Sequence, residues 1–154
     1  MKHYSSIIGW REWVSIPEYS EHPIKAKVDT GARTSALHAE DVVIKKIGRR
    51  KKVFFSILPQ QKSLKPKIQC EAWLVEMRNV RSSNGHVSER PVVEVEISIG
   101  EKKWPIELTL VNRDIMGFRM LLGRQAIRNL FLVDPGASFL HKKNKARKKK
   151  GKFL

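Results

Sequence analysis

The sequence predicts a mainly β fold in a single domain, on three observations. Residues 92–99 alternate almost strictly between apolar and polar side chains, and residues 104–110 alternate again after a short turn, which predicts a hairpin. Residues 24–28 alternate directly into Asp29. Only one segment, residues 124–130, has a convincing helical pattern, and it is short. The length of 154 residues is ordinary for one domain that buries its own core.

Further strands have weaker signals. Residues 53–58 and 72–77 are rich in β-branched and aromatic side chains, which favours strands. The pair Asn84-Gly85 is the strongest short hairpin signal in the chain, because both residues tolerate positive φ. Its polar neighbours predict that this hairpin tip projects from the body of the protein.

Two prolines mark further boundaries. Pro105 lacks a backbone donor, so we expect its strand to lie at a sheet edge or to begin near this residue. Residues 132–133 predict a last strand, and residues 134–136, Asp-Pro-Gly, predict a turn after it.

The composition favours a cytoplasmic protein. The single cysteine, Cys70, excludes an intrachain disulfide, and nothing points to an oxidising compartment. The first residues have no apolar segment typical of a secretory signal, and no apolar run approaches membrane-spanning length.

The positive charge is concentrated in two places. Residues 141–154 contain eight Lys or Arg and no acid, so this tail carries half of the net charge of +16. We interpret residues 1–140 as the folded domain and 141–154 as a basic, disordered tail. A second cluster surrounds Gly48. Its members are Lys45, Lys46, Arg49, Arg50, Lys51 and Lys52. Such clusters attract nucleic acid, anionic membrane surfaces or acidic peptides, although they also serve solubility alone.

The run Asp29-Thr30-Gly31-Ala32 carries the chemistry. An apolar strand ends in a carboxylate, Thr30 is suited to lock the loop by hydrogen bonding, and Gly31 lets backbone and substrate approach. A carboxylate that faces a second one shares a proton with it, because like charges at contact cannot both ionise. One then activates water while the other polarises a carbonyl. By itself, this three-residue motif also fits an ordinary Asx turn at a strand end.

A second segment raises the significance of the first. About ninety residues later the chain reads Leu121-Leu122-Gly123-Arg124 at the start of the predicted helix. With both segments present, the chain resembles the retropepsin-like aspartic peptidases. The resemblance implies a closed β-barrel of the acid-protease type with one short helix, in which Gly123 and Arg124 pack against the Asp29 loop. It also implies a hairpin that covers the substrate.

The resemblance extends to one bacterial branch of that family. This branch was once labelled as ATP-dependent zinc proteases and is associated with an ATP-grasp glutamate ligase of the RimK type, which is thereby an implied partner. The similar stretches cover most of residues 7–140. They are residues 8–12, 27–38, 81–86, 90–91 and 108–113.

The family resemblance implies a homodimer. The chain contains four Asp, and only Asp29 lies in Asp-Thr-Gly. A two-carboxylate site therefore needs Asp29 from each of two copies, related by a twofold axis. The alternative is an internal second carboxylate from Asp134, whose surroundings loosely resemble the Asp29 loop.

The substrate prediction rests on arginines. Retropepsins usually carry an acid after the Asp-Thr-Gly-Ala loop that pairs with the later Arg, but here Arg33 follows, and Arg124 lacks that partner. We predict that Arg33, Arg81 and Arg124 form an anion-binding rim for a carboxylate-rich peptide. Structural ion pairs are the alternative for each arginine. The hairpin residues expected to cap the cleft and contact substrate are Asn84, Gly85 and His86.

No metal or cofactor is predicted. The sequence has no H-E-x-x-H or C-x-x-C motif, no pair of His at ligand spacing, and no phosphate-binding loop of the G-x-x-x-x-G-K-[ST] type. The alternative is a metal site assembled in space from His38, His86 and a carboxylate.

These observations favour an aspartic endopeptidase that hydrolyses a peptide or amide bond with activated water at a dimer interface. Two alternatives stay open. One is a non-enzymatic module that binds acidic peptides and modulates a glutamate ligase. The other is a basic protein that binds nucleic acid or the ribosome through residues 45–52 and 142–152.

Overall fold

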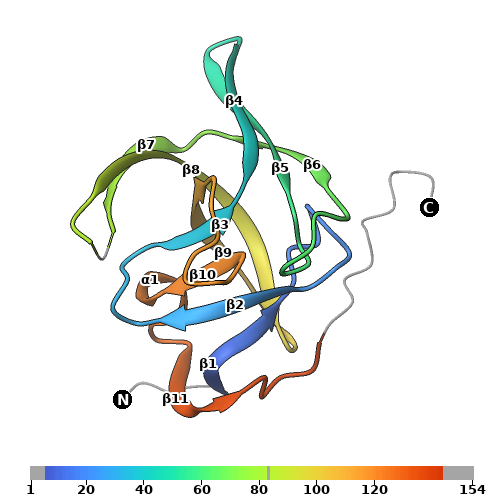
Figure 1. Ribbon diagram of the computed structural model, residues 1–154, viewed down its shortest axis with the longest axis vertical. Helices are drawn as coiled ribbons and strands as arrows, with labels where there is room; N and C mark the ends of the chain where they lie inside the picture. Colours follow the sequence, from blue (N-terminus) through green and yellow to red (C-terminus); the bar gives the residue numbers. More distant parts are fainter. Residues whose placement is uncertain (1–5, 83, 144–154) are drawn as a thin grey trace.

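The computed structural model describes residues 6–82 and 84–143, which form a mainly β structure with one short helix, as predicted (Figure 1). The elements are β1 Ser6–Val14, β2 Ile24–Asp29, β3 Ser35–His38, β4 Glu40–Ile47, β5 Arg50–Ile57, β6 Ile68–Trp73, β7 Glu76–Arg81, β8 Val87–Ile99, β9 Lys102–Val111, β10 Met120–Gly123, α1 Arg124–Ile127 and β11 Phe131–Ser138. Most of the predicted basic tail, from residue 144 onward, lies outside the described residues. Within the described part of the chain, no helix is long and apolar enough to cross a membrane.

The strands form two open sheets, so the prediction of a closed barrel is wrong. The larger sheet has the order β11-β1-β2-β10-β3-β9-β8-β7, and the smaller has the order β4-β5-β6. Among the described residues, the backbone pairing that joins the end of β1 to β8 is an isolated bridge between Ser15, the residue after β1, and Ser98, with N···O distances of 3.0 and 2.9 Å. The chain then turns at 16–20, and Pro17 has no N–H to extend the pairing. The pairing that would close the larger sheet into a barrel is therefore limited to one residue pair.

The predicted hairpins are present. Strands β8 and β9 pair from Ile99 opposite Lys102 to Val92 opposite Thr109, and Gly100 in the turn has φ of 58°. The strand β9 is not an edge strand, because β3 lies on its other side. Pro105 nevertheless has no second neighbouring strand to which a backbone N–H would donate, because β3 pairs with β9 only from residue 108 to residue 111. The proline is tolerated where the sheet is locally one-sided.

Three boundaries differ from the sequence predictions. Residues 72–77 are divided between two sheets, because the Leu74 amide bonds to β5 and the next amide bonds to β8. The helix ends at Ile127 and not at residue 130, and Asn129 adopts a positive φ of 69°. The last strand is longer than predicted. The predicted turn lies inside β11, where the register with β1 shifts between Asp134 and Ser138, and the amide of residue 136 bonds to the Asp134 carboxylate at 2.9 Å.

One core lies between the two sheets. Strand β5 contributes Val53, Phe55 and Ile57, and these pack in the same cluster as buried residues of the larger sheet. Members from the larger sheet include Ile8, Ala26, Leu37, Val93, Val95, Ile97, Leu108, Met120 and Leu122. The inner faces of the two sheets are therefore buried against each other.

The outer pairing of β1 with β11 depends on Gly9 and Glu12. A Cβ atom on Gly9 would lie 2.2 Å from the Ala137 carbonyl oxygen, so only glycine fits opposite this part of β11. The buried Glu12 carboxylate accepts backbone N–H bonds from Gly9 at 2.8 Å and from Leu140 at 2.9 Å. This carboxylate joins the two ends of the described chain.

We predict that Gly9→Ala lowers the free energy of unfolding by about 1–3 kcal/mol, because the added methyl group overpacks against β11 backbone. Gly136→Ala is the matched control, since its added Cβ would be 3.5 Å from Asp134 Oδ1, an ordinary contact. The control should change the free energy of unfolding by less than about 1 kcal/mol. Urea unfolding measures both, and equal effects would contradict the prediction.

Candidate active site

The two segments that the sequence singled out lie side by side. Asp29 is the last residue of β2 and stands opposite Gly123, the last residue of β10, in a parallel pairing. Beyond Asp29 the chain turns tightly, because the Ala32 amide donates to the Asp29 carbonyl at 3.1 Å. The Gly31 amide donates to Asp29 Oδ1 at 3.0 Å. The half-buried carboxylate is therefore held by its own loop.

The first residues of α1 hold this loop from the other side. The Arg124 amide donates to the Ala32 carbonyl at 2.8 Å, and the Gln125 amide donates to the Arg33 carbonyl at 3.2 Å. The Arg124 side chain donates to the Gly31 carbonyl at 3.1 Å. The first N–H groups of a helix have no acceptor within the helix, and here they donate to the carbonyl groups of the loop.

Gly123 is required for this contact. A Cβ atom there would lie 2.6 Å from the Thr34 carbonyl and 3.0 Å from the Ala32 carbonyl oxygen. The Gly123 amide donates to Ser35 Oγ at 3.1 Å, and the Thr109 hydroxyl donates to the Ser35 carbonyl at 3.1 Å. Both Ser35 and Thr109 are buried.

The predicted role of Thr30 stays a prediction. Thr30 is exposed, and no hydrogen bond from its side chain occurs within residues 6–82 and 84–143. Ser35, which the sequence did not single out, holds Gly123 through its hydroxyl group. Only the pairing of β3 with β9 and β10 reveals this contact, since a serine at the start of a strand has no special signal.

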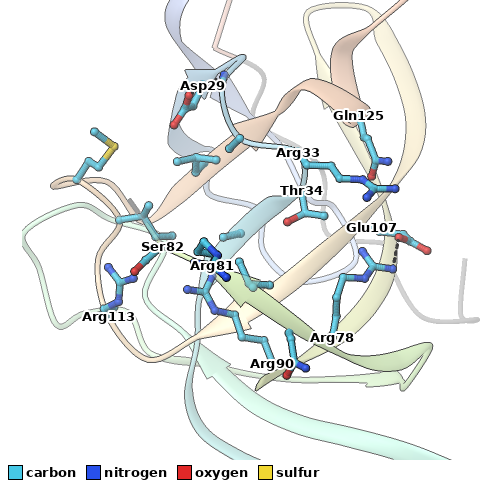
Figure 2. Close-up of a pocket in the computed structure, with 18 of the residues that line it drawn as sticks. Asp29, Arg33, Thr34, Arg78, Arg81, Ser82, Arg90, Glu107, Arg113 and Gln125 are labelled. Carbon is cyan, nitrogen blue, oxygen red and sulfur yellow. Dashed lines mark hydrogen bonds and ion pairs between the residues drawn. The ribbon is translucent and has the colours of Figure 1, made fainter. Parts of the chain in front are cut away.

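A cavity of about 760 Å³ opens beside Asp29, and Figure 2 shows the residues that line it. Its walls come from the Asp29 loop, the β7–β8 hairpin, β9 and the loop before β10. This volume is in the range of ordinary ligand sites. In the view of Figure 2, Asp29 lies at one end, and Arg81, Arg90 and Arg113 lie toward the other.

The cavity is strongly positive. Five arginines line it: Arg33, Arg78, Arg81, Arg90 and Arg113. Arg78 is neutralised, because it pairs with Glu76 and also with Glu107 at 3.0 Å. The other four have no carboxylate partner among the described residues. The cavity therefore holds an excess of donors suited to carboxylates.

Arg90 is the most constrained of these cations. Its side chain is 7% exposed, and its Nε donates to Ser88 Oγ at 3.0 Å. Burial, followed by the nearby positive charge of Arg113, lowers the pKa of Arg90 from its ordinary value. A buried cation without a counter-charge is costly, and an anion in the cavity would offset that cost.

Sequence analysis did not assign a role to Arg90 or Arg113. No local pattern distinguishes them from surface arginines, although both lie in stretches that carry the family resemblance. Arg90 lies on β8 and Arg113 lies in the loop after β9, and both side chains line the same cavity.

The other predicted substrate contacts divide between the cavity wall and the hairpin tip. Arg33 and Arg81 line the cavity, whereas Arg124 is not among the lining residues. Asn84, Gly85 and His86 are exposed at the tip of the hairpin, where Asn84 Oδ1 accepts the His86 amide at 3.0 Å. The predicted hairpin is thus present, and its stem residues rather than its tip form the cavity wall.

A second polar network supports the cavity wall. Buried His38 places Nδ1 2.6 Å from Asp114 Oδ1 and Nε2 3.2 Å from Glu40 Oε2. Arg119 donates to the same Asp114 oxygen at 2.7 Å and to the Ser63 carbonyl at 2.7 Å. Both ring nitrogens of His38 are thereby engaged. Within residues 6–82 and 84–143, no group of three or more His, Cys, Asp or Glu side chains is arranged to hold a metal ion, and His86 lies at the hairpin tip.

A mainly β fold, an Asp-Thr-Gly loop at a strand end and a Gly-Arg segment bonded to that loop define a retropepsin-like protein. A family model confirms this class. The chain belongs to the RimB-like family, described as "Retropepsin-like aspartic endopeptidase RimB", whose model matches residues 7–144.

Individual relatives carry a different name. The chain is 46% identical over 133 residues to a "Probable alpha-L-glutamate ligase" of Shewanella halifaxensis, covering 86% of this chain and 29% of that protein. It is 43% identical over 132 residues to a protein of the same name from Parasynechococcus marenigrum, covering 86% and 28%. The chain thus spans under a third of the curated relatives it matches.

A solved structure shares the fold. It is a Legionella pneumophila protein of unknown function, which is 27% identical and superposes with a TM-score of 0.76. The alignment covers 90% of this chain and 99% of that one.

We predict that the Asp114 network weakens in acid. Burial would raise the pKa of Asp114, but hydrogen bonds and charges from His38 and Arg119 outweigh it and hold the pKa below its ordinary value of 3.8. Stability from this lowered pKa is present above pH 3.8 and is lost as the pH falls below it. The difference in free energy of unfolding between wild type and Asp114→Asn should therefore shrink between about pH 5 and pH 2. Urea unfolding at several pH values measures this difference in free energy, and a difference that stays constant over the range would contradict the prediction.

Proposed function

We propose that this protein is an aspartic-type peptidase whose site is completed by Asp29 from two copies of the chain. The observation that carries the proposal is the position of Asp29. It lies at a strand end, fixed by the Gly31 amide at 3.0 Å, and it faces an open cavity of about 760 Å³. The membership in a retropepsin-like family supports the same assignment.

The reaction follows from two carboxylates that share one proton. The ionised Asp29 removes a proton from water, which attacks the scissile carbonyl carbon, while the protonated Asp29 of the second copy donates to the carbonyl oxygen. The tetrahedral intermediate then collapses: the first Asp29 gives the proton it took from water to the leaving amine, and a hydroxyl of the intermediate returns a proton to the second Asp29 as the new carbonyl forms. The Gly31 N–H bond holds one carboxylate oxygen and leaves the other for the water.

The described residues of one chain offer no suitable second carboxylate. Besides Asp29, the acids that line the cavity are Glu76 and Glu107, and Arg78 binds both. Asp134, the internal alternative, is exposed, accepts the Gly136 amide at 2.9 Å and does not line the cavity. These positions favour the homodimer over a site within one chain.

The cavity charge favours an acidic substrate. The guanidinium groups of Arg33, Arg81, Arg90 and Arg113 suit the side-chain carboxylates of a glutamate-rich peptide, and no carboxylate neutralises them in the described part of the chain. The similarity to one part of probable glutamate ligases supports the same substrate class, because such ligases add glutamate. We therefore propose a substrate, and a ligase partner, linked by glutamate-containing peptides.

We predict that Asp29→Asn lowers hydrolysis of oligo-glutamate peptides by at least about 100-fold, because the variant loses the general base. The fold should persist, since the carboxamide introduced by this substitution keeps an oxygen that can accept the Gly31 amide. Peptide hydrolysis is followed by mass spectrometry, and peptide binding by calorimetry. If wild type and variant both bind oligo-glutamate without cleaving it, the protein is a binding module and the peptidase proposal fails.

Mixing the two proteins tests the shared site. An excess of Asp29→Asn subunits should inhibit wild-type activity beyond simple dilution, because mixed dimers contain one carboxylate. Activity that stays proportional to the wild-type subunit would instead indicate a site within one chain. An Arg128→Gln variant, exposed and outside the cavity, controls for nonspecific effects of mixing.

We predict that Arg90→Gln lowers kcat/KM for oligo-glutamate by about 10- to 100-fold, which corresponds to one lost charged hydrogen bond. The same change should leave thermal stability equal or higher, because it removes a buried cation without a counter-charge. Hydrolysis of a neutral peptide, if measurable, should change little.

The combination of effects makes the test specific. Arg128→Gln serves again as the control and should leave both kcat/KM and the melting temperature near wild type. A large loss of stability in Arg90→Gln would show that Arg90 is structural and not a substrate contact.

A further inference from the structure

The hairpin of β4 and β5 stands away from the body of the protein (Figure 1). Residues 41–51 are all exposed, so the outer half of this ribbon has no cover from the rest of the described chain. Its inner half is anchored, because Val53 and Phe55 are buried in the core. The ribbon is therefore a fixed projection.

The ribbon carries cations on both faces. In the β4–β5 register Lys45 pairs with Lys52, and Lys46 pairs with Lys51. Since consecutive side chains of a strand point to opposite faces, these two pairs occupy opposite faces, about 3.4 Å apart along the ribbon. Arg49 lies at the turn beside Gly48, whose φ is 64°. Positive charge thus surrounds the tip.

Few carboxylates neutralise this charge. Lys52 pairs with Glu71 of β6 at 2.9 Å. At the base, Asp41 pairs with Lys67 at 2.8 Å. Within residues 6–82 and 84–143, the other cations of the ribbon have no ion pair. They are Lys45, Lys46, Arg49, Arg50 and Lys51. Cations directly opposite like cations repel each other, which disfavours this arrangement unless a polyanion binds it.

Aromatic side chains accompany the cations on one face. Trp73, which is 37% exposed, lies 4.0 Å from the Arg50 guanidinium and 4.8 Å from the Lys52 ammonium. The Lys45 ammonium lies 5.5 Å from the ring of Phe54. These cation–π contacts hold the long cationic side chains along this face of the ribbon.

We propose that the β4–β5 ribbon is a docking surface for duplex DNA and that it enters the major groove and binds the phosphates on both sides. A two-stranded ribbon fits a groove that is about 12 Å wide. Cations on both faces match two phosphate walls, whereas a flat anionic membrane would engage one face only.

This surface is separate from the candidate active site. No residue of β4 or β5 lines the cavity beside Asp29. DNA on the ribbon therefore leaves the cavity free for an acidic peptide. The inference does not rest on the proposed peptidase activity, and either of the two can fail alone.

The test compares two variants of the full chain that lose the same charge. The ribbon variant carries Lys45→Gln, Lys46→Gln, Arg49→Gln and Lys51→Gln. The control variant carries Lys62→Gln, Lys65→Gln, Lys103→Gln and Arg128→Gln, four exposed sites outside the ribbon. Fluorescence anisotropy measures affinity for a mixed-sequence DNA duplex of about 20 base pairs at several salt concentrations. Thermal unfolding verifies that both variants are folded.

We expect the ribbon variant to bind the duplex at least about tenfold more weakly than the control variant. The salt dependence, log K against log salt, should lose about 0.9 of slope for each contact removed. Equal weakening of both variants would show that net charge alone drives binding and would overturn the proposal. The proposal of a DNA-binding ribbon also fails if the ribbon variant keeps duplex binding but loses binding to anionic vesicles or to oligo-glutamate.

Discussion

The parallel pairing of β2 with β10 is the contact on which the candidate site depends. It places Asp29 opposite Gly123, and it brings the first amides of α1 within hydrogen-bond distance of the Asp29 loop. The absence of a Cβ at Gly123 permits this approach, because a side chain there would collide with the Thr34 carbonyl. A strand pair, one glycine and two helix amides thus hold a carboxylate at the mouth of a cavity.

The same region stores unfavourable charge. Arg90 is buried without a carboxylate partner among the described residues, and Arg113 adds a like charge nearby. Natural proteins tolerate such arrangements where a ligand supplies the missing charge, at some cost to the stability of the empty state. The His38–Asp114–Arg119 network differs in this respect. Its charges are paired, and it fixes the loop that carries Arg113 relative to β3 and β10.

The architecture separates two kinds of positive surface. Arginines in the cavity converge on a confined volume beside Asp29, whereas the lysine-rich β4–β5 ribbon projects into solvent. Arginine forks suit carboxylates held in fixed geometry, and flexible lysines suit a diffuse row of phosphates. The chain therefore presents two chemically different positive surfaces, one inside the cavity and one on the projecting ribbon.

The sequence by itself determined the elements whose signal is local. Alternation predicted β2, β8 and β9, the Asn84-Gly85 pair predicted the hairpin, and two short motifs identified the Asp29 loop and its partner segment. Only the tertiary structure decided the rest. Barrel closure depended on how far β1 runs before Pro17, and the hydroxyl that accepts the Gly123 amide belongs to Ser35. The cavity arginines Arg90 and Arg113 come from separate elements, and a side chain's burial and charge partners depend on residues distant in the chain, which no local pattern encodes.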